Sequence, residues 1–240
     1  MHPVLLETRW VTFYTYGFFV ALAAVAAFFL AVCRSSSAGL GKNEAADLVF
    51  LLFVSGVAGA RLFYVLQHFE SYRHNFWGIF SLQEGGLVWY GGFIVSAASG
   101  IAYAFFRKLP VLKLCDFFAP VLAFSHALGR IGCFFNGCCY GRAADRPFGV
   151  LFAGQDFPRF PVQLVESVFL FVLSLYLFYL SAKKPAPGTV FFRYLFLYAA
   201  FRFFIEFLRG DQELFFWLTI PQWISLGLMG LGVVLCRRSR

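Results

Sequence analysis

Charged residues are scarce in this chain of 240 residues. Asp, Glu, Lys and Arg make up only 13% of it, against about 25% in ordinary soluble domains, while 60% of the residues are hydrophobic and 21% are aromatic. A soluble core could not hide that much apolar surface, whereas a bilayer accepts apolar helices of about 20 residues whose backbone groups are paired internally. The composition therefore excludes an ordinary soluble protein and predicts an all-α, polytopic integral membrane protein, with residues 1–240 forming a single helical membrane domain.

The sequence also lacks the patterns that mark several other classes of protein. It has no internal repeat and no low-complexity tract, and its six cysteines are too few for a disulfide scaffold. The cluster Cys133, Cys138 and Cys139 has neither a CxxC pair nor an HxxxH partner, so no metal site is expected from the spacing. Small, soft side chains that let helices approach closely explain these cysteines instead.

Long apolar runs predict seven transmembrane helices. They cover roughly residues 14–33, 47–67, 86–106, 112–135, 162–181, 188–208 and 216–235. Ten Lys and Arg residues fall in the connections on one side and six on the other, which predicts that the first side is cytoplasmic. The N-terminus is then outside and the C-terminus cytoplasmic, and the connection of residues 139–161 is read as a small extracytoplasmic cap. The net charge of +8 calls for no nucleic acid, because cytoplasmic anchors and anionic membrane lipids account for it.

Several ionisable residues lie inside these apolar runs, where each costs about 2.5–3.5 kcal/mol on insertion scales. They are site candidates for that reason: Arg61, Arg130, Glu166, Arg193, Arg202, Glu206 and Arg209. Tyr198, Arg202, Glu206 and Arg209 recur at spacings of four, four and three, which predicts one polar helical face. One alternative is that Arg202 and Glu206 form a purely structural pair. The other follows from the arginines outnumbering the nearby carboxylates, which predicts a bound anion such as a phospholipid head group.

Six blocks of the sequence resemble, in order, those of the bacterial prolipoprotein diacylglyceryl transferases. They are YTYGFF, GARLFYV, EGGLVWYGGF, HALGRIGCFFNGCCYGR, FPVQLVES and YAAFRFFIEFLRGD. The resemblance implies a multi-pass protein of the bacterial cytoplasmic (inner) membrane with its active site facing the outer leaflet. It implies transfer of the diacylglyceryl group of phosphatidylglycerol to the lipobox cysteine of secreted prolipoproteins, which forms a thioether and releases glycerol phosphate. It implies no cofactor.

The resemblance also implies roles for individual residues. Arg130 and Arg202 match the two arginines expected to hold the phosphate, and Glu206 matches a glutamate expected to hold Arg202 in place. Further matches are expected to shape the phosphatidylglycerol site: Arg61, Tyr16, Asn136, Gly141, Gln163, Glu166 and Arg209. The glycine pairs 85–86 and 91–92 are expected either to let a substrate approach the backbone or simply to pack helices.

The chain departs from the family pattern at three positions. Tyr90 stands where well-known members have a histidine that has been proposed as the base. Because a tyrosine has a pKa of about 10, we expect Tyr90 to orient the thiol or the phosphate by hydrogen bonding. Cys133 and Cys138 replace an asparagine and an acidic residue of some members, and His126, four residues before Arg130, is either a substitute for the missing histidine or a satisfied polar residue between helices.

Two other functions remain open at this stage. An anionic-lipid binder or transporter would use the same arginines without catalysis, although many transporters show internal repeats that this chain lacks. A relative of the transferases with a different acceptor or lipid donor would account for Tyr90 and Cys133.

Overall fold

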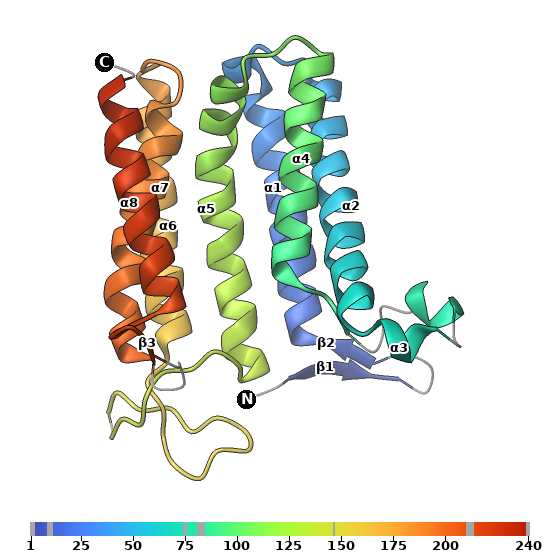
Figure 1. Cartoon of the computed structure of the whole chain (residues 1–240), viewed down its shortest axis with the longest axis vertical. Coiled ribbons are helices and arrows are strands. Elements are labelled where there is room, and N and C mark those ends of the chain that lie inside the picture. Colours follow the sequence, from blue (N-terminus) through green and yellow to red (C-terminus); the bar gives the residue numbers. More distant parts are fainter. Residues whose placement is uncertain are drawn as a thin grey trace. The chain divides into compact units, whose positions relative to one another are not determined.

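The computed structural model is mostly helical and describes residues 3–8, 12–73, 76–80, 85–145, 147–209 and 214–238. The strands form two short antiparallel hairpins, β1 with β2 and β3 with β4, which leaves the all-α prediction intact. The elements, shown in Figure 1, are β1 (Val4–Glu7), β2 (Thr12–Tyr14), α1 (Thr15–Ala38), α2 (Lys42–Gln67), α3 (Phe69–Tyr72), the 3₁₀ turn η1 (Phe76–Phe80), α4 (Trp89–Phe106), α5 (Val111–Asn136), α6 (Val162–Ala182), α7 (Thr189–Ile205), the 3₁₀ turn η2 (Glu206–Leu208), β3 (Leu214–Phe215), β4 (Leu218–Thr219) and α8 (Ile220–Arg238).

A long helix covers each of the seven predicted apolar segments. Among the described residues, five of these helices (α1, α2, α4, α5 and α6) are long and apolar enough to cross a membrane. Helix α7 has only 17 residues and includes Arg193 and Arg202, and the apolar part of α8 is the shorter segment Ile220–Leu235. A multi-pass membrane protein is therefore confirmed, whereas the count of seven spans stays a prediction.

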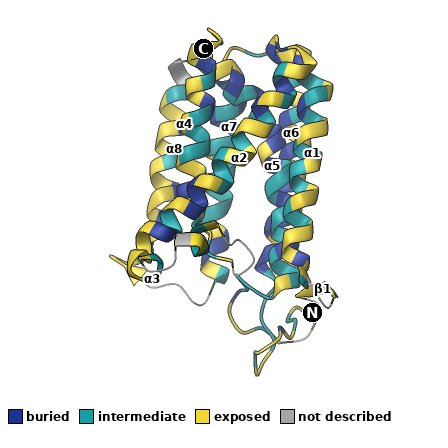
Figure 2. Cartoon of the chain, turned by 90° about the vertical axis from the view of Figure 1, so that its right-hand side faces the viewer, coloured by how far each residue is buried: buried dark blue, intermediate teal, exposed yellow. Residues whose placement is uncertain are grey.

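Exposed residues, yellow in Figure 2, run along the helices, and many of them are large and apolar. Phe50 is 69% exposed, Phe105 is 72% exposed and Val168 is 66% exposed. Monomeric soluble proteins rarely leave such extended apolar surface in water. Lipid acyl chains, which are as apolar as these side chains, are the solvent that this surface fits.

The chain divides into two compact units, residues 31–114 and residues 1–30 with 115–240. In the second of these units, α5 and α6 pack together through small residues of α5 and leucines of α6. Ala119, Ala123 and Ala127 recur at every fourth position of α5 and belong to one buried cluster with leucines of α6, including Leu170 and Leu177. Hydrogen bonds from Ser167 to the carbonyl of residue 127 and from Ser174 to that of residue 120 fix the register of the two helices.

In the unit of residues 31–114, α2 and α4 approach closely through glycines. A Cβ atom on Gly59 would lie 2.6 Å from the carbonyl oxygen of Gly91, and one on Gly91 would lie 2.5 Å from Cβ of Phe63. A Cβ atom on Gly92 would likewise lie 2.9 Å from the carbonyl oxygen of Gly56. Of the two expectations for the pair 91–92, the structure therefore supports helix packing.

The connection between α5 and α6 is pinned to the helix ends rather than extended away from them. The N–H of Gly141 donates to Phe160 and the N–H of Arg142 donates to Leu208. Phe152 is 1% exposed and lies against the rings of Phe134 and Tyr140. Phe152 therefore packs inside the connection, whereas Phe148 and Phe157 are exposed, and an extracytoplasmic cap stays a prediction.

Candidate active site

The register of α5 and α6 places Arg130 beside Glu166. Arg130 follows Ala127 by three residues and Glu166 precedes Leu170 by four, so both extend the buried seam between the two helices. Nε of Arg130 lies 3.0 Å from a carboxylate oxygen of Glu166, and the side chains are 16% and 1% exposed. A carboxylate buried this completely needs a cation and hydrogen bonds to offset its desolvation. Arg130 supplies the cation.

Helix α7 adds a third group to this pair. The hydroxyl of Tyr198 donates to the other oxygen of Glu166 at 3.0 Å. The imidazole of His126 lies edge-on to the ring of Tyr198, with the ring centres 5.3 Å apart, and its Nε2 is 4.0 Å from Glu166. His126 thus contacts the site from α5, one turn before Arg130.

Arg202 is held by a separate carboxylate. Its Nη1 lies 2.7 Å from Glu206, and the two side chains are 14% and 0% exposed. The hydroxyl of Thr219 donates to the second oxygen of Glu206 at 3.3 Å, and the backbone N–H of Thr219 donates to Gln222. The beginning of α8 therefore fixes the carboxylate that orients Arg202.

The predicted single helical face of residues 198–209 is only partly right. The α-helix ends at Ile205, and Glu206–Leu208 form a 3₁₀ turn. Arg209 follows in extended backbone, with φ −85° and ψ 132°. Because the 3₁₀ turn has three residues per turn instead of 3.6, the chain leaves the α-helical path after Ile205, and Arg209 lies outside the helix.

The two arginines act on the same pair of side chains. His126 and Tyr198 each lie within electrostatic range of both Arg130 and Arg202. Glu166, to which Tyr198 donates, also binds Arg130 directly. Three helices, α5, α6 and α7, therefore bring both guanidinium groups around one small polar cluster.

Arg130 and Arg202 are each paired with a carboxylate, Glu166 and Glu206 respectively. Among the described residues, Nε of Arg209 is buried without a hydrogen-bond partner. That the site binds an anion, as the excess of arginines over carboxylates in the sequence indicates, stays a prediction.

Four other predicted residues lie in the same unit. Gln163 is 1% exposed and donates to the carbonyl oxygen of Cys138 at 2.6 Å, while its own Oε1 is buried without a partner among the described residues. Asn136 is the last residue of α5, and Tyr16 on α1 lies within electrostatic range of Arg130. A Cβ atom on Gly141 would lie 2.6 Å from the carbonyl oxygen of Leu208, so only glycine lets the cap meet the end of η2.

Three thiols lie beside Arg130. The sulfur atoms of Cys133, Cys138 and Cys139 are all within 4.8 Å of one another. Hydrogen bonds from the other two thiols, followed by the positive charges of Arg130 and Arg209, lower the pKa of Cys139, which lies beyond the end of α5.

Two predicted site residues, Arg61 and Tyr90, belong to the other unit, so their proximity to Arg130 stays a prediction. All three nitrogens of the Arg61 guanidinium are engaged: they donate to the carbonyl oxygens of residues 78, 79, 85 and 86 and to the hydroxyl of Tyr72. Arg61 is 7% exposed, and its visible role is to hold the segment before α4. Tyr90 is 60% exposed at the beginning of α4.

Sequence reasoning did not assign Thr219 or Gln222 to the site, and it placed Tyr198 on the polar face with Arg202 without giving it a role. Gln222 is a polar residue in an apolar segment and is 2% exposed. Thr219 gave no comparable signal, because its contact with Glu206 comes from the packing of α7 and α8.

The sequence of the chain is similar to one family of membrane enzymes over almost its whole length. The family described as prolipoprotein diacylglyceryl transferase matches residues 3–238. The chain belongs to this family. Similar proteins named phosphatidylglycerol–prolipoprotein diacylglyceryl transferase come from Clostridium tetani (33% identical, 97% of this chain and 96% of the relative) and Clostridium kluyveri (32%, 95% and 89%). A relative from Clostridium perfringens, named phosphatidylglycerol–prolipoprotein diacylglyceryl transferase 2, is 31% identical over 98% of this chain and 94% of its own length.

Membership gives the polar cluster a chemical context. The names of these relatives state phosphatidylglycerol, a phosphate-bearing lipid, as their donor, and guanidinium groups are in general good partners for phosphate. Arg130, Arg202, Glu166 and Glu206 are the members of the cluster that the sequence had already singled out.

Proposed function

We propose that this protein transfers the diacylglyceryl group of phosphatidylglycerol to the lipobox cysteine of prolipoproteins, forming a thioether and releasing glycerol phosphate. The observation that supports it most is the arrangement of Arg130 and Arg202 around His126, Tyr198 and Glu166. Family membership and the names of the relatives agree with this chemistry.

The chemistry of the site suits that of the donor. Phosphatidylglycerol is a phosphodiester with a single negative charge, and guanidinium groups are good partners for phosphate oxygens. Glu166 meets Arg130 at Nε and Glu206 meets Arg202 at Nη1, and we expect the other guanidinium N–H groups to donate to the phosphate. The carboxylates position the arginines for that contact.

An apolar groove beside the cluster suits an acyl chain of the donor. It has a volume of about 300 Å³ and is lined by residues of α5 and α6, including Ala127, Ile131, Val168 and Phe171. Ile131 follows Arg130 directly and Ser167 follows Glu166, so the groove begins next to the ion pair. A lipid with its phosphate at Arg130 could place a tail there.

The reaction is a displacement at a glycerol carbon. The thiolate sulfur forms the new bond to carbon, the bond from that carbon to phosphate oxygen breaks, and the electron pair leaves with glycerol phosphate. Negative charge grows on the phosphate as the bond breaks, and fixed guanidinium groups in a water-poor site stabilise that charge best. We expect Gln163, whose Oε1 is unpartnered among the described residues, to accept a hydrogen bond from the glycerol head group.

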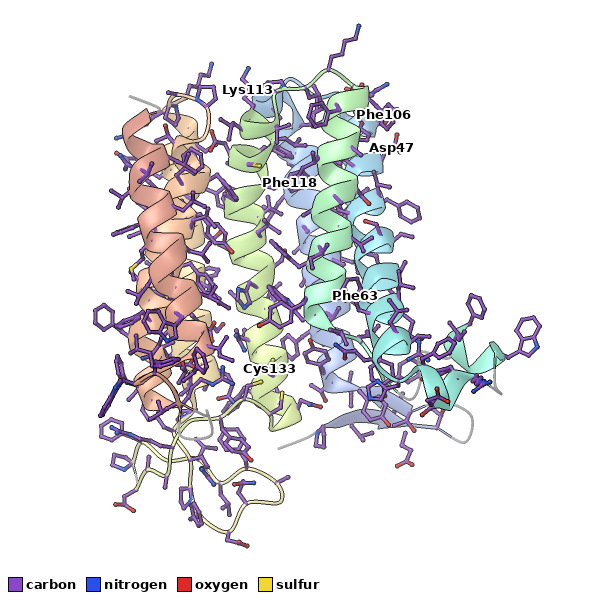
Figure 3. All side chains as sticks on the ribbon, in the orientation of Figure 1. Asp47, Phe63, Phe106, Lys113, Phe118 and Cys133 are labelled. Carbon is purple, nitrogen blue, oxygen red and sulfur yellow. The ribbon has the colours of Figure 1, made fainter. Side chains whose placement is uncertain are left out.

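The site lies at one end of the helices of its unit, where α5 ends and α6 begins. Lys113 and Cys133, labelled in Figure 3, mark the two ends of α5, and the cluster belongs to the end of Cys133. Lys183 and Lys184 follow the opposite end of α6. We propose that the lysine end is cytoplasmic, that the chain crosses the inner membrane seven times as one domain, and that the site faces the outer leaflet.

One assay tests the transfer. The purified protein is incubated in detergent with phosphatidylglycerol and a lipobox peptide, and the peptide is analysed by mass spectrometry. We expect the peptide to gain the mass of diacylglycerol less one water, as a thioether requires, and this adduct to be lost in Arg130→Ala and Arg202→Ala. Arg193→Ala is the matched control, because Arg193 is on α7 but donates to Tyr176 outside the cluster. Lipid binding without any adduct would instead favour a non-enzymatic lipid binder, and an adduct formed only from another lipid would identify a different donor.

A further inference from the structure

The fold brings three cysteines together although their spacing in the sequence has no CxxC pair. Cys133 is in the last turn of α5, and the chain turns back after Asn136 through two residues in the left-handed region, Gly137 (φ 76°) and Cys139 (φ 63°). The N–H of Cys138 then donates to the carbonyl oxygen of Cys133 at 3.2 Å. A cysteine at positive φ is strained by about 1–3 kcal/mol, and such strain is typical of functional sites.

The distances between the thiols fit a thiophilic metal ion. The three sulfur atoms lie within 4.8 Å of one another, and all three cysteines are free and half-buried. In a tetrahedral zinc site with bonds of about 2.3 Å, sulfur atoms are about 3.8 Å apart. Side-chain rotations that shorten the sulfur–sulfur distances by about 1 Å at most would therefore bring all three thiols into contact with one ion.

The surroundings favour an anionic complex at this place. Three thiolates around a divalent ion leave a net charge of −1, and the guanidinium groups of Arg130 and Arg209 act electrostatically on Cys139. The carbonyl oxygen of Cys138 is fixed by Gln163 at 2.6 Å, which holds the turn in place.

The proposed reaction needs something that this cluster could supply. The attacking cysteine of the prolipoprotein must lose its proton, and the position where well-known members have a histidine is Tyr90 here. A thiol that coordinates zinc is deprotonated outright, while its sulfur stays nucleophilic enough to react. Zinc with three protein ligands keeps a fourth position open for such a group.

We propose that Cys133, Cys138 and Cys139 bind one zinc ion, and, on the basis of the proposed function, that its open position takes the acceptor cysteine as a thiolate. The acceptor thiol releases its proton to water on binding. Its sulfur then bonds to the glycerol carbon, the carbon–oxygen bond to phosphate breaks, and the electron pair leaves on glycerol phosphate, so no oxidant or reductant is needed.

Cobalt(II) is the probe, because a cobalt–thiolate complex absorbs light and zinc does not. We expect the purified, metal-depleted protein to bind one Co²⁺ with sulfur-to-metal charge-transfer absorption and the visible bands of a tetrahedral site, and one equivalent of Zn²⁺ to remove both. The variants Cys133→Ser, Cys138→Ser and Cys139→Ser should each weaken cobalt binding at least tenfold. Cys115→Ser is the matched control, since Cys115 is a free cysteine at the other end of α5.

The acceptor is tested with the same spectrum. A lipobox peptide should shift the visible cobalt bands as a fourth sulfur enters, whereas the same peptide with serine in place of cysteine should not. Thermal unfolding of each serine variant shows that it still folds. Absence of cobalt–thiolate absorption in folded wild-type protein with all three thiols reduced overturns the metal site, and a disulfide among the three in protein purified without reductant overturns it as well.

The two proposals can fail separately. A cobalt spectrum that does not respond to the peptide overturns coordination of the acceptor by the metal. A responding spectrum with no diacylglyceryl adduct under any lipid supports the metal site and overturns the proposed transfer.

Discussion

Replacing Tyr198 by phenylalanine removes one hydrogen bond from the carboxylate that holds Arg130. The hydroxyl of Tyr198 donates to Glu166 at 3.0 Å, and Glu166 is 1% exposed, so water cannot take its place without rearrangement. A hydrogen bond to a charged group contributes about 1.5–3 kcal/mol. For a chain of this size, that loss corresponds to a decrease in Tm of about 3–12 °C.

The same loss sets a limit on the effect on catalysis. With a factor of ten for each 1.36 kcal/mol, transfer should slow by at most roughly 10- to 150-fold, because Arg130 keeps its ion pair with Glu166. Tyr194→Phe is the control, since its ring stacks on that of Tyr198 at 6.1 Å, one turn away on α7. Initial rates of peptide lipidation and thermal unfolding in detergent measure both effects. Equal behaviour of the two phenylalanine variants would refute the role given to Tyr198.

Three further substitutions test the packing and the ion pairs by thermal unfolding. Gly59→Ala should destabilise the protein by about 1–3 kcal/mol, because the new Cβ would lie 2.6 Å from a carbonyl oxygen of α4. Gly227→Ala is the control: it has open space and should be neutral or slightly stabilising. Similar Tm shifts in the two variants would contradict the close approach of α2 and α4. Asp116→Asn should cost about 1–2 kcal/mol, since this carboxylate accepts hydrogen bonds from backbone N–H groups at the beginning of α7. An unchanged Tm would show that these hydrogen bonds do not stabilise the helix end. Glu206→Gln should cost about 3–5 kcal/mol by leaving buried Arg202 without its counter-charge, and a stabilised variant would disprove the pairing.

The positions of the helices could be predicted from the sequence because a bilayer imposes a simple pattern on them. Each predicted apolar run corresponds to a helix, and some ends are shifted by several residues: α1 ends at Ala38 instead of residue 33, and α2 begins at Lys42 instead of residue 47. The end of α7 was mispredicted. Periodicity alone could not show that the chain tightens into a 3₁₀ turn after Ile205 and carries Arg209 off the helical face.

The candidate site was predicted in its composition more than in its pairing. Charged residues inside apolar runs pointed to Arg130, Arg202, Glu166 and Glu206, and the structure brings these into two ion pairs. Which carboxylate binds which arginine depends on helix register, which the alanines of α5 and the leucines of α6 set.

The meeting of the thiols could not be predicted in the same way. It depends on two left-handed residues, Gly137 and Cys139, and backbone conformation of that kind leaves no periodic signal in a sequence. The spacing of Cys133, Cys138 and Cys139 suggested no common site, whereas the turn after α5 places their sulfur atoms within 4.8 Å of one another.

The central claim is that Arg130 and Arg202 bind one phosphate together. Its most direct test is an experimental structure of the protein in a lipid nanodisc with phosphatidylglycerol bound. We predict phosphate oxygens about 2.7–2.9 Å from nitrogen atoms of both guanidinium groups, with Arg130 still paired to Glu166 and Arg202 to Glu206. A head group bound at only one of the two arginines, or away from both, would contradict the claim.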